Sequence, residues 1–364
     1  MRDIRGIFFA SYVMLVCLGA VMIYSSSGVY ALEVMGNSAY FLIRHVMFLA
    51  IGAVMMWWIM SIDYRDIQKY AKWCLTAAFV MLVLVLVPHI GKISSGARRW
   101  FSVGPINFQP SEYAKIAVII YCADFFARKR ALIRSFKLGF MPVAMVMGAM
   151  CLLIIKQPDL GNTVLVAVIT MSMYFVAGGR KILFGAIAAI AVPVLTLLII
   201  AAPYRMRRIV SFMNPWDDAR GAGFQLSQSQ IAFASGGFWG VGLGKSVQKL
   251  FYLPAAHTDF IFSIIGEELG FLGALAVVFL FGVFIWQGTR IIRNTADPFG
   301  YFLAVGIMVM LSIQVVVNIG VSIGALPTKG LPLPFISYGG SALIFNMMAV
   351  GLLLNVSRTQ DIGG

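Results

Sequence analysis

Charged residues are scarce in this chain of 364 residues: Asp, Glu, Lys and Arg together make up only 12% of it, whereas 60% is hydrophobic. So little polar sequence cannot cover the surface of a water-soluble fold. The mean hydropathy of +0.90 leads to the same conclusion. The composition therefore excludes a soluble globular protein and predicts one that crosses a membrane several times.

Cysteine and histidine are also rare, with four and three residues. The cysteines all fall in apolar segments, where no disulfide on an outer face is expected, and neither residue type has the spacing of a metal clamp. The stretch "WGVGLGKS" ends like a nucleotide-binding loop, but Trp239 stands where that loop needs glycine. We therefore expect no structural metal site, no nucleotide site of this kind and no nucleic-acid partner.

Ten mostly apolar runs have the length, or nearly the length, of a membrane-spanning helix. The first exceeds the apolar core of a signal peptide, so we expect it to be a retained helix. The sequence thus predicts an all-α polytopic membrane protein of about ten transmembrane helices in a single integral membrane domain, residues 1–364. The ten runs are Ile7–Tyr24, Phe41–Met60, Trp73–Pro88, Ser111–Ala127, Leu138–Ile155, Asn162–Ala177, Ile182–Ala202, Phe260–Gly288, Tyr301–Ile323 and Leu343–Val356.

The short connections between these runs indicate the orientation of the chain. "RKRALIRSFK", "DYRDIQKYAK", "GGRK" and "RIIR" all fall on one side of the membrane in a ten-helix threading, together with both termini. Because basic residues in short loops stay in the cytoplasm, we expect a multi-pass protein with both termini cytoplasmic.

Two connections on the opposite side are too elaborate for simple turns. The large outer loop between the seventh and eighth helices, residues 203–260, interleaves cations with aromatic residues and glycines, and loops of this length are usually functional. The outer loop between the ninth and tenth helices, residues 323–342, is rich in Pro and Gly and cannot form a regular helix. We expect it to be re-entrant, which is tolerated at membrane depth where the backbone lines a cavity.

The outer side also holds more cations than the charge rule predicts. They cluster near Arg98 and Arg99, along the large outer loop up to Lys245 and Lys249, and at Lys329. One interpretation is solvated loop charge, since long translocated loops escape the rule. The other is an outward basic site for an anion at the membrane surface, such as a lipid pyrophosphate.

Acidic residues near or inside the apolar runs need an explanation, because a charge at the centre of a spanning helix costs about 2.5 to 3.5 kcal/mol. Asp259 directly precedes the eighth run, where it is either a helix cap or a functional carboxylate. Glu112 and Lys115 are three residues apart and share a helix face, so they form an intramembrane pair or flank a cavity. We expect Asp159 to cap a helix, and Glu267 and Glu268 to pair inside the protein.

Four motifs in order resemble the SEDS family, whose members include FtsW, RodA and SpoVE. They are "GARRWFSVGPINFQPSEYAK", "QPDLGN", residues 214–273 and "LPTKGLPLPFISYGGSAL". The segments "AHTDFIF" and "GKSVQKL" are more similar to FtsW, the division member, than to RodA. Many FtsW-like chains carry a glutamate where this one has Ala255, so no acid role is assigned there.

The resemblance implies a ten-helix peptidoglycan glycosyltransferase that polymerises lipid II on the outer face of a bacterial cytoplasmic (inner) membrane. It also implies a class B penicillin-binding protein and other divisome membrane proteins as partners, in contact with membrane lipids. Expulsion of undecaprenyl pyrophosphate needs a base and cations, so Asp259 is expected to be the general base. The candidates for substrate binding are Arg98, Arg99, Glu112, Lys115, Lys245, His257, Lys329, Ser337, Gly339 and Gly340. Whether a divalent cation assists stays open, and no other cofactor is expected.

Two other functions are compatible with the sequence. A ten-helix bundle with intramembrane charges fits a lipid II flippase, and a non-catalytic scaffold for the transpeptidase partner is not excluded. The motif-dense loops crowd one face, whereas the cytoplasmic loops are short and basic. This asymmetry favours the enzyme.

Overall fold

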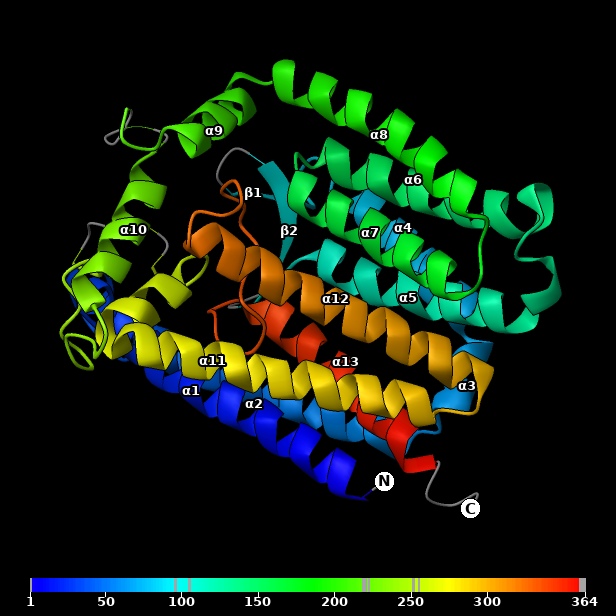
Figure 1. Ribbon diagram of the computed structural model, residues 1–364, viewed down its shortest axis with the longest axis horizontal. Helices are drawn as coiled ribbons and strands as arrows, with labels where there is room; N and C mark the ends of the chain where they lie inside the picture. Colours follow the sequence, from blue (N-terminus) through cyan, green and yellow to red (C-terminus); the bar gives the residue numbers. More distant parts are fainter. Residues whose placement is uncertain are drawn as a thin grey trace.

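The computed structural model describes residues 2–94, 97–103, 106–217, 221, 223–250, 253–254 and 256–359. These form an elongated helical bundle with a small β-sheet near one end (Figure 1). The helices are α1 (Arg2–Met35), α2 (Tyr40–Ser61), α3 (Tyr64–Lys69), α4 (Ala71–Leu84), α5 (Pro110–Arg128), α6 (Met141–Lys156), α7 (Leu160–Val176), α8 (Lys181–Ile200), α9 (Pro203–Met213), α10 (Phe224–Gly236), α11 (Ile261–Asn294), α12 (Pro298–Ser322) and α13 (Gly340–Thr359), with short 3-10 and π turns at Arg130–Leu132 and Phe136–Phe140.

The predicted all-α membrane fold is confirmed, and each predicted apolar run coincides with a long helix: α1, α2, α4 to α8 and α11 to α13. Within the described residues, seven helices are long and apolar enough to cross a membrane. Helices α4 and α7 are apolar but shorter, and α5 carries four charged residues, which lowers its hydropathy. The number of ten spans therefore stays a prediction.

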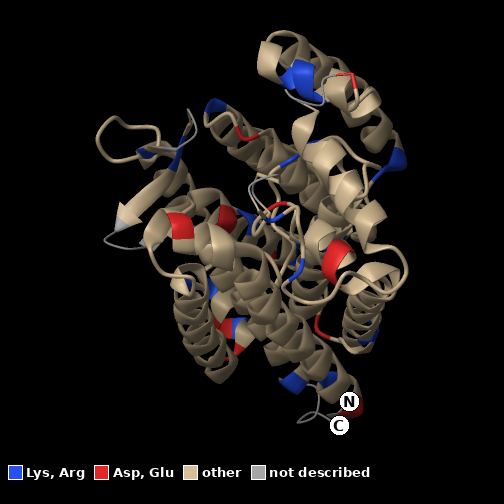
Figure 2. Ribbon diagram, turned by 90° about the vertical axis from the view of Figure 1, so that its left-hand side faces the viewer, with Lys and Arg blue, Asp and Glu red and all other residues tan. Residues whose placement is uncertain are grey.

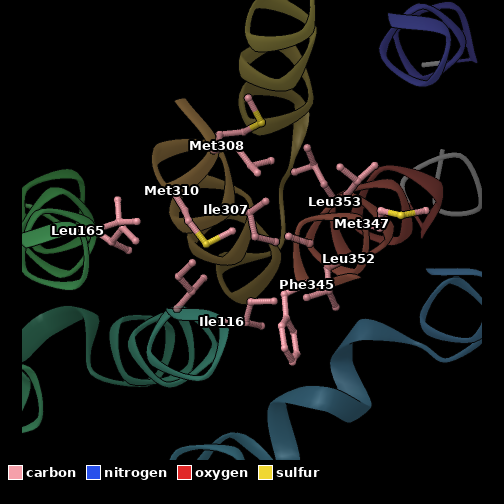
Figure 3. Packing of buried hydrophobic residues seen from close by; sticks show 14 of the residues in the cluster. Ile116, Leu165, Ile307, Met308, Met310, Phe345, Met347, Leu352 and Leu353 are labelled. Carbon is pink, nitrogen blue, oxygen red and sulfur yellow. The ribbon is translucent and has the colours of Figure 1, made fainter. Parts of the chain in front are cut away.

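Helix α12 lies at the centre of the bundle and packs against α5, α7, α11 and α13. Its apolar side chains pack against those of the neighbouring helices. Examples are Ile307 of α12, Ile116 of α5 and Phe345 of α13, which are each at most 7% exposed (Figure 3). A helix that is apolar around most of its circumference is stable only where other helices or lipid cover it. Burial of α12 thus positions the loops at its two ends.

Helix α8 lies at the edge of the bundle, and none of its residues is buried (Figure 1). Near its start, the ring of Phe184 packs on Tyr174 and Phe175 of α7, with centroids 5.6 and 5.5 Å away. Farther along α8, Leu195 and Ile199 line a cavity. An exposed apolar helix of this length belongs in hydrocarbon.

Helix α11 is broken near its start. Gly270 has a φ of 69°, which is unfavourable for other residues. The carbonyls of Glu267 and Glu268, at the end of the short first part, accept from the backbone N–H groups of Val241 and Gly242, each at 3.0 Å. The loop after α10 therefore replaces the hydrogen bonds that the break removes, and the two glutamates are held in a fixed place.

The sequence did not predict the three antiparallel strands β1 (Lys92–Ser94), β2 (Ala97–Val103) and β3 (Ile106–Phe108), in the order β1-β2-β3. In the register of β2 and β3, Phe101 lies opposite Phe108, and their rings stack at 6.4 Å. The Phe108 ring also packs on Phe345 of α13 at 5.5 Å. Tertiary contact with the bundle thus stabilises strands too short to be recognised locally.

The start of α1 and the end of α13 lie at one end of the bundle, away from α9, α10 and the sheet (Figure 1). The segment between α12 and α13 runs at the end that carries the sheet. It has no helical stretch, yet Leu333, Phe335 and Ile336 are at most 1% exposed. A Cβ on Gly19 of α1 would lie 2.4 Å from the Phe335 carbonyl, so the coil packs directly on that helix. Entry of this coil into the membrane stays a prediction.

Candidate active site

A cavity of about 710 Å³ lies among the segments at the end of the bundle that carries α9 and the sheet. Its walls come from β2, the start of α7, the far end of α8, α9, α10, the loop before α11 and the loop after α12. The lining residues are Ala97, Arg99, Pro158, Asp159, Leu160, Gly161, Val164, Leu195, Ile199, Tyr204, Arg205, Arg208, Ile209, Gln225, Asp259, Phe260, Pro327, Thr328, Lys329 and Gly330. The cavity therefore combines an apolar wall with a charged one.

The charged wall holds four cations and two carboxylates. Figure 2 looks onto this end of the bundle and shows basic and acidic residues together around the middle of the face. An excess of cations in a concave, partly apolar site attracts an anion such as a phosphate. The six groups are Arg99, Arg205, Arg208, Lys329, Asp159 and Asp259.

Asp259 lies in the loop before α11 and is not the helix cap that was its alternative role. The N-cap position of α11 belongs to Phe260, and no side chain caps this helix. A Cβ on Gly330 would lie 3.1 Å from the Asp259 Oδ2 atom, so the loop after α12 approaches the carboxylate closely. Burial raises the pKa of Asp259 to about 6, although the positive charge of Arg208 opposes this shift.

Arg99 lines the cavity and Arg98 does not. Successive side chains of a strand point to opposite faces, which separates these neighbours on β2. The Arg99 guanidinium donates from Nε to the carbonyl of Gln157 at 2.7 Å and from Nη2 to that of Pro158 at 2.6 Å. These bonds join the sheet to the start of α7 and hold the cation at the cavity wall.

Asp159 has the predicted role of a helix cap and also lines the cavity. Its Oδ1 accepts from the Asn162 N–H at 3.1 Å, and its Oδ2 accepts from the amides of Asn162 and Gln109 at 2.9 and 3.2 Å. Lys329 lies on the same cavity, where burial lowers its pKa and the charge of Asp159 opposes that shift. Asp159 is thus held rigidly beside a half-buried cation.

Two arginines of α9 line the cavity although they were not among the candidates for substrate binding. Arg205 and Arg208 are three residues apart and so share a helix face, which faces the cavity. Arg205 is fixed by bonds from Nε to the Tyr204 hydroxyl at 2.8 Å and from Nη1 to the Leu198 carbonyl at 2.9 Å. The i, i+3 spacing after Pro203 was the available signal, but only once a helix was recognised there.

Glu112 and Lys115 form the predicted pair inside the bundle instead of lining the cavity. Their charged groups lie 2.8 Å apart, and both side chains are at most 4% exposed. Both residues lie in the first two turns of α5. Burying two opposite charges together avoids the cost of an isolated buried charge, so the pair has a sufficient structural explanation.

The structure does not bring four other candidates into the cavity lining. The Ser337 hydroxyl donates to the Thr258 carbonyl at 2.6 Å and accepts from the Leu333 N–H at 2.9 Å, so it is already engaged. Gly340 begins α13, and a Cβ there would lie 2.6 Å from the ring of Phe48. The other two are Gly339, which directly precedes α13, and Lys245, which is exposed.

His257 lies two residues before Asp259 but outside the cavity lining. Its imidazole is surrounded by the rings of Phe41, Tyr338 and Tyr30, with centroids 4.6, 5.9 and 6.0 Å away. Burial lowers its pKa to about 4. The neutral ring therefore packs as an aromatic group within the loop that carries Asp259.

Glu267 and Glu268 pair internally, as predicted. Glu268 contacts Lys249 at 2.8 Å, with side chains 0% and 5% exposed, and accepts from the Ser25 hydroxyl of α1 at 2.5 Å. Glu267 accepts from the Ser246 hydroxyl and from the Val247 N–H, the latter at 2.9 Å. Lys249 is therefore a structural cation that anchors the large outer loop to α11.

The described residues contain no group of three or more His, Cys, Asp and Glu that suits a metal ion. The cavity itself offers two carboxylates, both beside cations. Ala255, for which no acid role was assigned, lies outside the described residues.

Comparison with known proteins gives consistent matches along nearly the whole chain. The family described as cell cycle protein, which groups FtsW, RodA and SpoVE, matches residues 5–362. Stage V sporulation protein E of Bacillus subtilis is 44% identical over 345 residues, covering 95% of this chain and 94% of that protein. A probable peptidoglycan glycosyltransferase FtsW of Trichlorobacter lovleyi is 45% identical over 345 residues, with coverages of 95% and 91%.

Among solved structures, one chain from work on the structural coordination of polymerization and crosslinking by a peptidoglycan synthase complex has the same fold. Its TM-score is 0.80 at 29% identity, and the match covers 96% of this chain and 97% of that chain. The similarity thus extends over the bundle and the loops that form the cavity.

Proposed function

Because this chain belongs to the family of cell cycle proteins that includes FtsW, RodA and SpoVE, we propose that it is a peptidoglycan glycosyltransferase that polymerises lipid II. The observation that carries this proposal is the cavity whose wall combines four cations with the carboxylate of Asp259, which caps no helix. A lipid pyrophosphate leaving group needs the cations, and an attacking sugar hydroxyl needs the carboxylate.

In the proposed reaction, a hydroxyl oxygen of the incoming lipid II attacks the anomeric carbon of the growing strand. The new C–O bond forms as the bond from that carbon to the pyrophosphate oxygen breaks. Asp259 takes the hydroxyl proton, and the bond electrons leave with undecaprenyl pyrophosphate. With a pKa of about 6, about nine-tenths of Asp259 is ionised at pH 7 and ready to accept a proton.

The cations have separate supports, which suits a fixed anion site. Arg99 is held by backbone carbonyls before α7, Arg205 by α8 and α9, and Lys329 lies on the loop after α12. Charges that are oriented before the reaction stabilise the departing pyrophosphate without reorganisation. The apolar residues of α7 and α8 in the same cavity suit the lipid end of the substrate.

We place the cavity on the outer face of the bacterial cytoplasmic membrane and both termini in the cytoplasm. The basic short loops support this orientation. The similarity to a chain of a peptidoglycan synthase complex supports a class B penicillin-binding protein as partner. Division is the favoured role, since curated relatives include FtsW proteins; other divisome contacts are part of the proposal.

The test is polymerisation of labelled lipid II by the purified protein, with glycan strands resolved on a gel. Asp259→Asn keeps the size and polarity of the side chain but removes the base, so we expect the rate to fall by about 10² to 10⁴. Asp66→Asn, at an exposed carboxylate that pairs with Lys69, is the matched control. Near-normal polymer from Asp259→Asn contradicts the mechanism, and leaflet exchange without polymer identifies a flippase instead.

A further inference from the structure

Asn318 of α12 joins two neighbouring loops that line the cavity. Its side-chain Nδ2 donates to the backbone carbonyl of Asp259 at 2.9 Å and to that of Leu331 at 2.8 Å. The first loop carries the carboxylate, and the second carries Lys329 and Gly330 directly before Leu331. Asn318 is 1% exposed and lies outside the cavity lining, so it reaches the site only through these loops.

The orientation of the Asn318 amide follows from its partners. Both are backbone carbonyl oxygens, which only accept hydrogen bonds, so the amide nitrogen must face them and uses both of its hydrogens. An aspartate at this position would place a carboxylate oxygen against two carbonyls and repel both. The contact therefore needs an amide, not merely a side chain of this size.

Asn318 completes a series of three consecutive bonds. The carbonyl of His257 accepts from the Tyr338 N–H at 2.9 Å, that of Thr258 accepts from the Ser337 hydroxyl at 2.6 Å, and that of Asp259 accepts from Asn318. Tyr338 and Ser337 belong to the coil between α12 and α13, whereas Asn318 belongs to the central helix. The helix thus gives the catalytic loop its rigid support.

We propose that Asn318 is a positioning residue for glycosyl transfer, whose amide holds the Asp259 loop and the Lys329 loop in register beside each other at the cavity wall. The inference rests on the proposed role of Asp259 as base. Without the amide, the carbonyls of Asp259 and Leu331 lose this donor and both loops gain freedom. Because misplacement of a catalytic group by about 1 Å can cost about 10² in rate, the loss should appear in kcat.

Asn318→Leu and Asn318→Asp should each lower kcat about 10- to 100-fold. The KM for lipid II should change less than about threefold, because Arg99 and Arg205 are supported by other elements. Asn318→Ser keeps one donor and should retain more activity than Asn318→Leu. Asn346→Leu is the matched control: Asn346 is a buried amide on α13 that donates to Gln314 and contacts neither loop through a hydrogen bond.

A double-mutant comparison separates this inference from the proposed function. If Asn318 acts through Asp259, adding Asn318→Leu to Asp259→Asn should lower the residual rate no further. A further tenfold loss in the double variant, or a normal rate in Asn318→Leu alone, overturns the positioning role. A normal rate in Asp259→Asn instead overturns the proposed base. If Asn318→Leu does not accumulate in the membrane, the same comparison with Asn318→Ser decides.

Discussion

The acid side of the pH profile should report the ionisation of Asp259. Its pKa is raised to about 6 because the carboxylate is buried, and Arg208 limits the rise. A base works only when deprotonated, so activity should be high above pH 6 and fall below it. The ionised fraction is about 0.9 at pH 7 and about 0.1 at pH 5, which predicts a rate about tenfold lower at pH 5.

Removing Arg208 should move the midpoint of the acid limb of the pH profile to higher pH. Its positive charge favours the ionised carboxylate, so Arg208→Gln should raise the pKa of Asp259 and shift the acid limb to higher pH. Arg208 also lines the cavity, and the rates must therefore be taken at saturating lipid II. Arg207→Gln is the control, because Arg207 is an exposed neighbour on α9 outside the cavity lining.

The assay is the initial rate of glycan formation by the purified protein between pH 5 and 8, with the folded fraction checked by size-exclusion chromatography at each pH. A flat profile between pH 5 and 7 would contradict Asp259 as the base. An acid limb that stays in place in Arg208→Gln would show that the two groups are not coupled as the structure indicates.

Three further predictions follow from the placement of the cations. Arg99→Ala should raise the KM for lipid II by about tenfold, measured by the same assay, whereas Arg98→Ala should change it little because that side chain does not line the cavity. Lys249→Met leaves a carboxylate buried without its cation and should destabilise the protein by about 3 to 5 kcal/mol, seen as a lower Tm in detergent; Lys245→Met, at an exposed site, should not. In a cysteine-free background, Lys245→Cys should react with an impermeant maleimide on intact spheroplasts and Arg134→Cys should not; the reverse pattern refutes the orientation.

Much of the fold was predictable because its signals are local. Apolar runs identify helices wherever the surroundings are apolar, and each of the ten runs coincides with a helix. The cap at Asp159 and the pair of Glu112 and Lys115 follow from spacings of three residues along the chain. By contrast, the strands around Arg99 and the break at Gly270 were not predicted. The strands are short and pack on Phe345 of α13, and the break depends on bonds from the loop after α10.

The sequence by itself determined the membrane class and the family resemblance and made Asp259 a candidate, because hydropathy, motifs and charge are properties of short stretches. Only the tertiary structure decided which of the many loop cations line the same cavity as that carboxylate. It brings Arg205 and Arg208 to the cavity, leaves Lys245 exposed, and places Lys249 in a buried ion pair. The reason is that convergence depends on the paths of segments that are far apart in sequence, and those paths are set by packing within the folded bundle.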